Sequence, residues 1–216
     1  MQTHPDFPGL SIVGHPLVQH KLSRMRDSAC QTGEFRRLLK EISFLIGYEV
    51  TRHLPLTRTL IHTPMQEMQA PVLSGGLPVV VPVLRAGLGM ADGLVELMPD
   101  CHIGHIGLYR DEDTHRPVEY LVRLPQAQDS LFIVTDPMLA TGHSSEYALD
   151  LLNRHGVEDR RIVLMCLVSA PEGVAQIQKT HPKVRIYTAS LDERLDERAY
   201  ILPGLGDAGD RLFGTL

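Results

Sequence analysis

The chain has 216 residues, enough for one large α/β domain with a substantial buried core. Hydrophobic residues make up 43% of it, but only 5% are aromatic and there is no Trp. Its core is therefore mainly aliphatic, as is typical of parallel strands covered by helices on both faces. The net charge of −5 argues against a protein that coats nucleic acid through a basic surface.

The first predicted element is an amphipathic helix over residues 34–53. Its apolar positions recur at helical spacing, and charged residues occupy the other side. These positions are Phe35, Leu38, Leu39, Ile42, Leu45 and Ile46.

Alternating strands and helices predict the fold. The predicted strands cover residues 77–84, 101–109, 130–135, 161–169 and 184–189. Helical spacing separates the central ones, over residues 90–98, 144–155 and 173–180. This order predicts a single domain over residues 1–216, with a mainly parallel sheet flanked by helices and joined by right-handed crossovers.

A glycine-rich turn follows the first predicted strand. Arg85 is succeeded by Ala86-Gly-Leu-Gly89, whose small residues let backbone amides and the guanidinium approach an anion. Taken in isolation, Arg85 also fits a surface arginine that caps a strand.

Residues 109–123 are highly charged and interrupt the alternation of elements. The spacing of Val118, Tyr120 and Val122 predicts the return strand of a hairpin that projects from the edge of the sheet. Such a hairpin fits a surface arm or a lid over a ligand, and the two interpretations are compatible.

The strand at residues 131–134 leads through a short polar loop into the next helix, which Gly156 ends. The loop offers hydroxyl groups, Gly142 for close backbone approach, and the free amides of a helix N-terminus. Asp136 ends the strand at the sheet edge where α/β proteins place their ligands, and its carboxylate can accept hydrogen bonds from two sugar hydroxyls. The pattern predicts a phosphate site, although an ordinary turn would share it.

The carboxyl-terminal segment is rich in glycine. Pro203, Gly204, Gly206 and Gly209 predict an irregular loop that exposes backbone donors and acceptors to a ligand. A tail that merely closes the domain would explain the glycines but not the two neighbouring aspartates.

Four segments resemble, in the same order, the signature segments of the uracil phosphoribosyltransferase family. They are residues 82–90, 104–112, 136–142 and 200–215. The resemblance extends from about residue 9 to 216. It implies a type I phosphoribosyltransferase fold and transfer of the phosphoribosyl group of phosphoribosyl pyrophosphate (PRPP) to N1 of uracil, which gives UMP and pyrophosphate.

The resemblance also implies roles for individual residues. The catalytic residues would be Arg85, Arg110, Asp136 and Asp207. The PRPP-binding residues would be Arg85, Arg110, Asp136, Pro137, Met138, Leu139, Ala140, Thr141, Gly142, His143, Ser144 and Asp207. The uracil-binding residues would be Ile201, Gly206, Asp207 and Ala208.

The resemblance further implies a cofactor and partners. Mg²⁺ would be held mainly by PRPP and water, with no direct protein ligand. Asp207 would either orient the water shell of the metal or help to remove the N1 proton, and these roles stay open. We expect a homo-oligomer, with GTP as a candidate effector and neither nucleic acid nor a membrane as a partner.

Two positions depart from the common family pattern. His143 stands where the phosphate loop often has Gly, and Thr135 stands where an aliphatic residue is usual. Neither change removes a backbone amide. We expect the side chain of His143 to point outward.

Two other functions are less consistent with the sequence. A non-catalytic regulator on the same fold that binds nucleotides and RNA would need a basic face, and the sequence has no Lys or Arg cluster to supply one. Purine transferases typically carry two adjacent acids at the end of the PRPP strand, whereas Pro137 follows Asp136 here.

The remaining residue types indicate no further site. Cys30, Cys101 and Cys166 are widely spaced and predict reduced thiols, and the eleven histidines show no zinc-binding spacing. No apolar run approaches the roughly 20 residues that span a bilayer, and the amino terminus does not resemble a signal peptide. The sequence therefore predicts a cytoplasmic protein.

Overall fold

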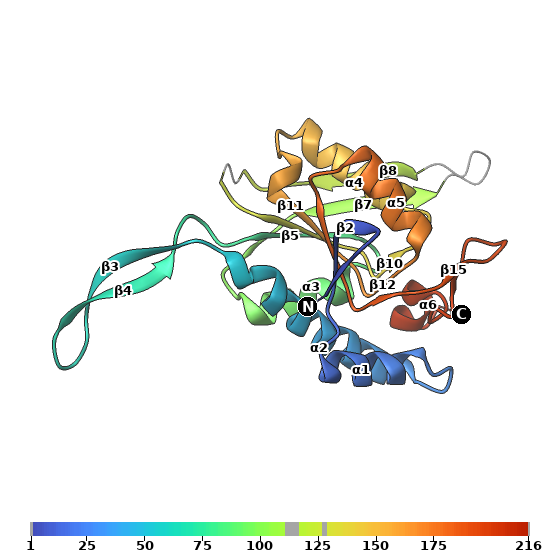
Figure 1. Cartoon of the computed structure of the whole chain (residues 1–216), viewed down its shortest axis with the longest axis horizontal. Helices are drawn as coiled ribbons and strands as arrows, with labels where there is room; N and C mark the ends of the chain where they lie inside the picture. Colours follow the sequence, from blue (N-terminus) through green and yellow to red (C-terminus); the bar gives the residue numbers. More distant parts are fainter. Residues whose placement is uncertain (1, 111–116, 127–128, 216) are drawn as a thin grey trace.

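A nine-stranded sheet runs through the middle of the molecule in the computed structural model, which describes residues 2–110, 117–126 and 129–215 (Figure 1). In spatial order its strands are β1 (Gln2–His4), β2 (Phe7–Ile12), β13 (Arg185–Thr188), β11 (Ile162–Met165), β9 (Phe132–Thr135), β5 (Val79–Leu84), β7 (His105–Arg110) and β8 (Pro117–Arg123), with β6 (His102–Ile103) paired to β5. Antiparallel pairs, β1 with β2 and β7 with β8, close the two edges, and every other pairing is parallel. The predicted mainly parallel sheet is confirmed.

Three central strands bend at their carboxyl ends. β9, β11 and β13 are followed by short strands, which form a separate parallel sheet in which β12 lies between the other two. These strands are β10 (Met138–Leu139), β12 (Val168–Ser169) and β14 (Ser190–Leu191). The predicted strand at residues 161–169 is therefore two strands. The predicted phosphate loop likewise contains a short strand, β10, which pairs with β12. The amino-acid pattern there predicted only a loop.

Six α-helices of the described residues flank the sheet. They are α1 (Pro16–Arg26), α2 (Thr32–Val50), α3 (Leu88–Leu97), α4 (His143–Arg154), α5 (Pro171–Thr180) and α6 (Ala208–Phe213), with 3₁₀ turns η1 (Thr51–His53) and η2 (Asp159–Arg161). The predicted helix at residues 34–53 is confirmed as α2, which begins two residues earlier and passes into η1. Among the helices of the described residues, none has both the length and the apolar character needed to cross a bilayer.

The two faces of the sheet carry separate cores. Val80 and Ile133 point to the side covered by α1, α2, α3 and α6. Their neighbours Val81 and Val134 point to the side covered by α4 and α5. This alternation along buried parallel strands explains the continuous apolar runs in the sequence.

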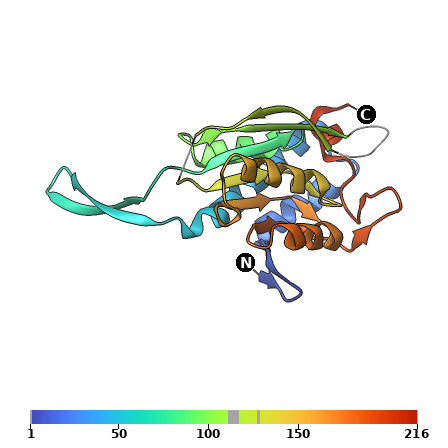
Figure 2. The same cartoon turned by 90° about the horizontal axis from the view of Figure 1, so that it is seen from above.

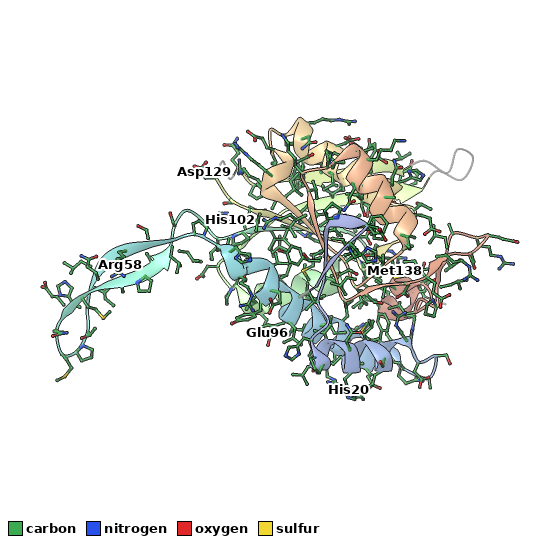
Figure 3. The ribbon with its side chains drawn as sticks, viewed as in Figure 1. His20, Arg58, Glu96, His102, Asp129 and Met138 are labelled. Atoms are coloured by element: carbon green, nitrogen blue, oxygen red, sulfur yellow. The ribbon has the colours of Figure 1, made fainter. Side chains whose placement is uncertain are left out.

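A two-stranded arm projects far from the body, and the sequence did not predict it (Figures 1 and 2). It consists of β3 (Leu56–His62) and β4 (Glu67–Leu73), which pair antiparallel in continuous register from Leu56 opposite Leu73 to His62 opposite Glu67. Figure 3 places Arg58 on this arm, far from Met138 in the body. The charged hairpin predicted at residues 109–123 falls on β7 and β8, which pair antiparallel at the edge of the main sheet, and its turn lies outside the described residues.

Candidate active site

A cavity of about 390 Å³ lies beyond the carboxyl ends of β5 and β9, a volume suited to a small-molecule ligand. Segments that are far apart in the sequence line it. The lining residues are Arg85, Ala86, Asp136, Met138, Ala140, Thr141, Gly142, Ser144, Ser145, Arg198, Ala199, Tyr200, Ile201, Gly206, Asp207, Ala208 and Gly209. The predicted phosphate loop, arginine turn and base-binding segment therefore meet at one place.

Of the predicted site residues whose side chains are described, most line this cavity, and three do not. Pro137 and Leu139 are buried beneath the loop, and the exposed His143 side chain lies 3.7 Å from the carboxylate of Glu146. His143 thus points outward, as expected. The side chain of Arg110 is outside the described part of the chain, but its backbone ends β7, which runs parallel to β5 with Gly107 opposite Leu84. Arg110 therefore reaches the same edge of the sheet as the arginine turn.

The phosphate loop ends in a helix N-terminus that can receive an anion. Gly142 adopts a left-handed conformation, with φ of 87°, and precedes the first residue of α4. The first backbone hydrogen bond of the helix runs from the amide of Glu146 to the carbonyl of Gly142, at 2.8 Å. The amides of His143, Ser144 and Ser145 precede it and have no partner within the helix, so they are available to phosphate oxygens.

Asp136 lines the cavity, and the surrounding protein shields its carboxylate from water. Its carboxylate accepts a hydrogen bond from the amide of Met138 at 3.3 Å and another from the hydroxyl of Ser145. Burial raises the pKa of Asp136 to about 6, and these two hydrogen bonds only partly oppose the rise. Asp136 therefore changes charge near pH 6, and it faces the place where the ribose of PRPP is predicted to bind.

The affinity for PRPP is expected to decrease as the pH is lowered, because Asp136 becomes protonated. Only the deprotonated carboxylate accepts from both ribose hydroxyls, so Kd should be constant above about pH 7 and rise as the pH falls through the pKa of about 6. Asp136→Asn should bind PRPP about 10–100-fold more weakly at pH 8, on the scale of a hydrogen bond to a charged group. Calorimetric titration from pH 5 to 8 measures both effects. The 5′-phosphate of PRPP titrates in the same range, so the contribution of Asp136 is the difference between the pH profiles of Kd for the wild type and for Asp136→Asn. Identical pH profiles for the two proteins would contradict the role of Asp136.

The arginine turn is fixed by close backbone contacts with β9. A Cβ atom on Gly87 would lie 2.3 Å from the carbonyl oxygen of Thr135, so no side chain fits there. The hydroxyl of Thr135 donates a hydrogen bond to the carbonyl of Gly87 at 3.0 Å. The residue that departs from the family pattern thus ties the turn to the strand that ends at Asp136. Arg85 follows a cis peptide bond, and its guanidinium lies 5.4 Å above the ring of Phe213.

The carboxyl-terminal segment is more regular than predicted. Its irregular part is confined to residues 203–207, between β16 (Ile201–Leu202), which pairs with β15 (Arg194–Leu195), and α6. The carboxylate of Asp207 accepts a hydrogen bond from the amide of Asp210 at 2.9 Å and caps α6. Asp at this position followed by a short helix is a common capping arrangement, so the expectation that the irregular loop extends to Gly209 was wrong.

A turn that the sequence interpretation missed forms another wall of the cavity. The carboxylate of Asp196 accepts hydrogen bonds from the amides of Arg198 and Tyr200, both at 2.8 Å. Ala199, between them, has a positive φ of 63°. The signal for this turn in the sequence is Asp196, near the start of a charged stretch, because aspartate favours such turns.

Among the described residues, no group of three or more His, Cys, Asp and Glu side chains is placed to hold a metal ion. Asp136 and Asp207 are the acidic residues that line the cavity. All three cysteines are free, with Cys166 buried, as the sequence predicted.

Comparison with known proteins assigns the chain to a family. The family model for uracil phosphoribosyltransferase matches residues 12–215. Uracil phosphoribosyltransferase of Ralstonia pickettii is 61% identical over 215 residues, covering 100% of this chain and 99% of the relative. That of Rhodospirillum centenum is 60% identical over 215 residues, with 100% of both chains covered.

A solved structure supports the same assignment. The AQ2163 protein from Aquifex aeolicus superposes with a TM-score of 0.88 at 33% identity, covering 94% of this chain and 97% of that one. The sheet order and the cavity therefore sit in a fold shared with a solved structure. Together with the family match, this shows that the chain belongs to the uracil phosphoribosyltransferase family.

Proposed function

We propose that the protein transfers the phosphoribosyl group of PRPP to N1 of uracil and releases pyrophosphate. The observation that supports this best is the meeting of three segments at one cavity: the turn at Arg85, the loop from Asp136 to Ser145, and residues 201–209. In this reaction the bond from C1′ to pyrophosphate breaks, the bond from C1′ to N1 forms, and N1 loses its proton.

Each segment has a part in this proposal. The amides at the start of α4 bind the 5′-phosphate, and the carboxylate of Asp136 accepts from the ribose hydroxyls. The guanidinium groups of Arg85 and Arg110 stabilise negative charge on the departing pyrophosphate. Backbone groups near Gly206 pair with the edge of uracil.

The cavity suits a metal ion that is carried in by the substrate. Mg²⁺ prefers oxygen ligands and keeps several of its waters, and the carboxylates of Asp136 and Asp207 are oxygen donors at the cavity wall. When bound with PRPP, Mg²⁺ would neutralise charge on the pyrophosphate. Asp207 would orient its water shell or help to remove the N1 proton. Activation by GTP and a cytoplasmic location stay predictions.

The function is tested by release of pyrophosphate from PRPP in the presence of purified protein. The proposal expects release that depends on uracil and on Mg²⁺, with UMP formed in equal amount. Release with hypoxanthine or adenine but not with uracil would assign the protein to another base.

We also propose that the arm of β3 and β4 joins two copies of the chain. A two-stranded hairpin is at best marginally stable alone in water, and this one carries exposed apolar side chains, with Leu60 at 52% and Met65 at 91%. Exposed apolar surface on an extended arm is typical of a protein interface, and the edges of a two-stranded sheet favour pairing. A second copy that presents the same surface is the partner that fits the expected homo-oligomer.

Substitution of Leu60 should dissociate this oligomer. Leu60→Asp is expected to give a monomer in sedimentation velocity at micromolar concentration, because an unpaired charge is costly in an apolar interface. Leu17→Asp is the matched control, since Leu17 is similarly exposed, at 53%, but lies on α1. A monomeric wild type, or an oligomer that survives in Leu60→Asp but not in Leu17→Asp, would exclude the arm as the interface.

A further inference from the structure

A partly buried ion pair lies against the loop that brings Gly206 to the cavity. Arg26 ends α1, and its two terminal nitrogens donate to the two carboxylate oxygens of Asp192, at 2.6 and 2.7 Å. The Asp192 side chain is only 2% exposed. Neither residue lines the cavity, so neither is placed to touch a substrate bound there.

The same pair fixes both backbone polar groups of Gly204. Arg26 Nη1 donates to the carbonyl of Gly204 at 2.6 Å, and the amide of Gly204 donates to Asp192 Oδ2 at 2.9 Å. Gly204 has a positive φ of 60°, and a Cβ atom there would lie 2.0 Å from the carbonyl oxygen of Ile201. The chain is thus held in a tight turn directly after β16.

A second arginine holds the next residue of the loop against the same end of α1. Arg211 Nη1 donates to the carbonyl of Leu205 at 2.9 Å and to that of Met25 at 2.5 Å, while Nη2 donates to the carbonyl of Asp27 at 2.7 Å. Two consecutive carbonyls of the loop are therefore occupied by arginines. Within the described residues, the backbone amides of Gly206 and Asp207 donate no hydrogen bond to another protein group, and both residues line the cavity.

The ion pair is charged under ordinary assay conditions. Burial acts to raise the pKa of Asp192, but hydrogen bonds from Arg26 and Ser190, together with the charge of Arg26, outweigh it and hold this pKa below its usual value. A charged, bidentate pair whose carboxylate is buried has a defined geometry, which suits it to fixing a backbone.

We propose that Arg26 and Asp192 are positioning residues that set the selectivity of the base site by fixing the base loop, residues 203–207. The inference rests on the proposed function and adds to it the origin of base selectivity. A site that reads a base through main-chain groups discriminates only if the loop cannot turn to satisfy the wrong base. Its donors and acceptors must stay unpaired when the wrong base binds. The clamp on Gly204 supplies this rigidity from outside the site.

Arg26→Lys tests the clamp directly. Lysine keeps the positive charge, but a single ammonium lacks the planar fork that reaches Asp192 and Gly204 together. The KM for uracil should rise about 10–100-fold, the size of effect expected for a lost charge-assisted hydrogen bond. The kcat at saturating uracil and the Kd for PRPP should each stay within about threefold of wild type. The ratio of kcat/KM for uracil to that for cytosine should fall by about tenfold or more, because a loosened loop can adapt to cytosine.

Asp192→Asn provides a second variant of the same volume, and it should show the same pattern. If the uncompensated Arg26 prevents this variant from folding, Arg26→Lys alone decides. Glu41→Gln is the matched control, because it removes the ion pairs of Glu41 with Lys21 on α1 and with Arg37 on α2 without touching the base loop. The control should keep wild-type values of KM, Kd and selectivity.

The outcomes separate the inference from the function on which it rests. A wild type without uracil-dependent pyrophosphate release would end the proposed function itself. A wild type that is active, with folded clamp variants that retain its KM for uracil and its selectivity, would overturn only the clamp. Equal losses in PRPP affinity and in uracil KM would also overturn it, since they would indicate a general structural defect.

Discussion

Replacing Arg85 with alanine is expected to lower kcat by roughly 10²–10³-fold, on the scale of removing one preorganised electrostatic donor from a reaction centre. Arg85 is an exposed side chain at the wall of the cavity, on a turn that Gly87 and Thr135 fix against β9. The free energy of folding should change little, because the side chain is exposed and its guanidinium lies over the ring of Phe213 at 5.4 Å. Steady-state kinetics with varied PRPP, together with thermal unfolding, measure both quantities.

Matched variants separate charge from geometry in this result. Arg85→Lys should recover only part of kcat, because an ammonium cannot bind two pyrophosphate oxygens side by side. Arg110→Ala should behave like Arg85→Ala if both groups stabilise the same leaving pyrophosphate. Arg37→Ala is the control, since Arg37 is an exposed arginine on α2 away from the cavity. An Arg85→Ala variant with unchanged kcat and kcat/KM for PRPP would remove Arg85 from the mechanism.

Cytosine is expected to be a poorer substrate than uracil by roughly 10²–10⁴-fold in kcat/KM, because two buried groups would be left unpaired at about 1–3 kcal/mol each. Uracil presents an acceptor, a donor and an acceptor at O2, N3–H and O4. Cytosine presents an acceptor at N3 and a donor at C4. Backbone groups near Gly206, on a loop clamped by two arginines, cannot exchange donors for acceptors.

One further substrate and one protein variant sharpen the test of base selection. 5-Fluorouracil keeps the uracil edge and adds little volume, so it should be turned over. Truncation of Ile201, whose side chain lines the cavity but is almost buried, should weaken uracil binding more than it changes selectivity. Comparable kcat/KM values for uracil and cytosine would contradict recognition through the backbone, even if phosphoribosyl transfer itself were observed.

The sequence by itself determined the elements whose patterns are local. The apolar spacing of α2 and the aliphatic runs of β5 and β9 repeat over a few residues, and each was predicted close to its observed bounds, whereas the run at residues 161–169 was predicted as one strand and is the two strands β11 and β12. The polar loop after β9 was predicted for the same reason, since a strand, an acid, a glycine and a helix start lie within some ten residues. Parallel order followed from the alternation of strands and helices.

Only the tertiary structure decided which distant residues meet and how they are held. The partners Arg26 and Asp192 are 166 residues apart in the sequence, and Arg26 and Gly204 are 178 apart. No local sequence pattern can therefore predict these two interactions. The pKa of Asp136 depends on burial that the whole fold creates. The arm of β3 and β4 was missed because nearly all of its side chains are exposed in the single chain, so the burial that normally marks strand faces is absent. Local patterns specify elements because they reflect periodic burial, whereas a site depends on long-range contacts that form only when those elements pack.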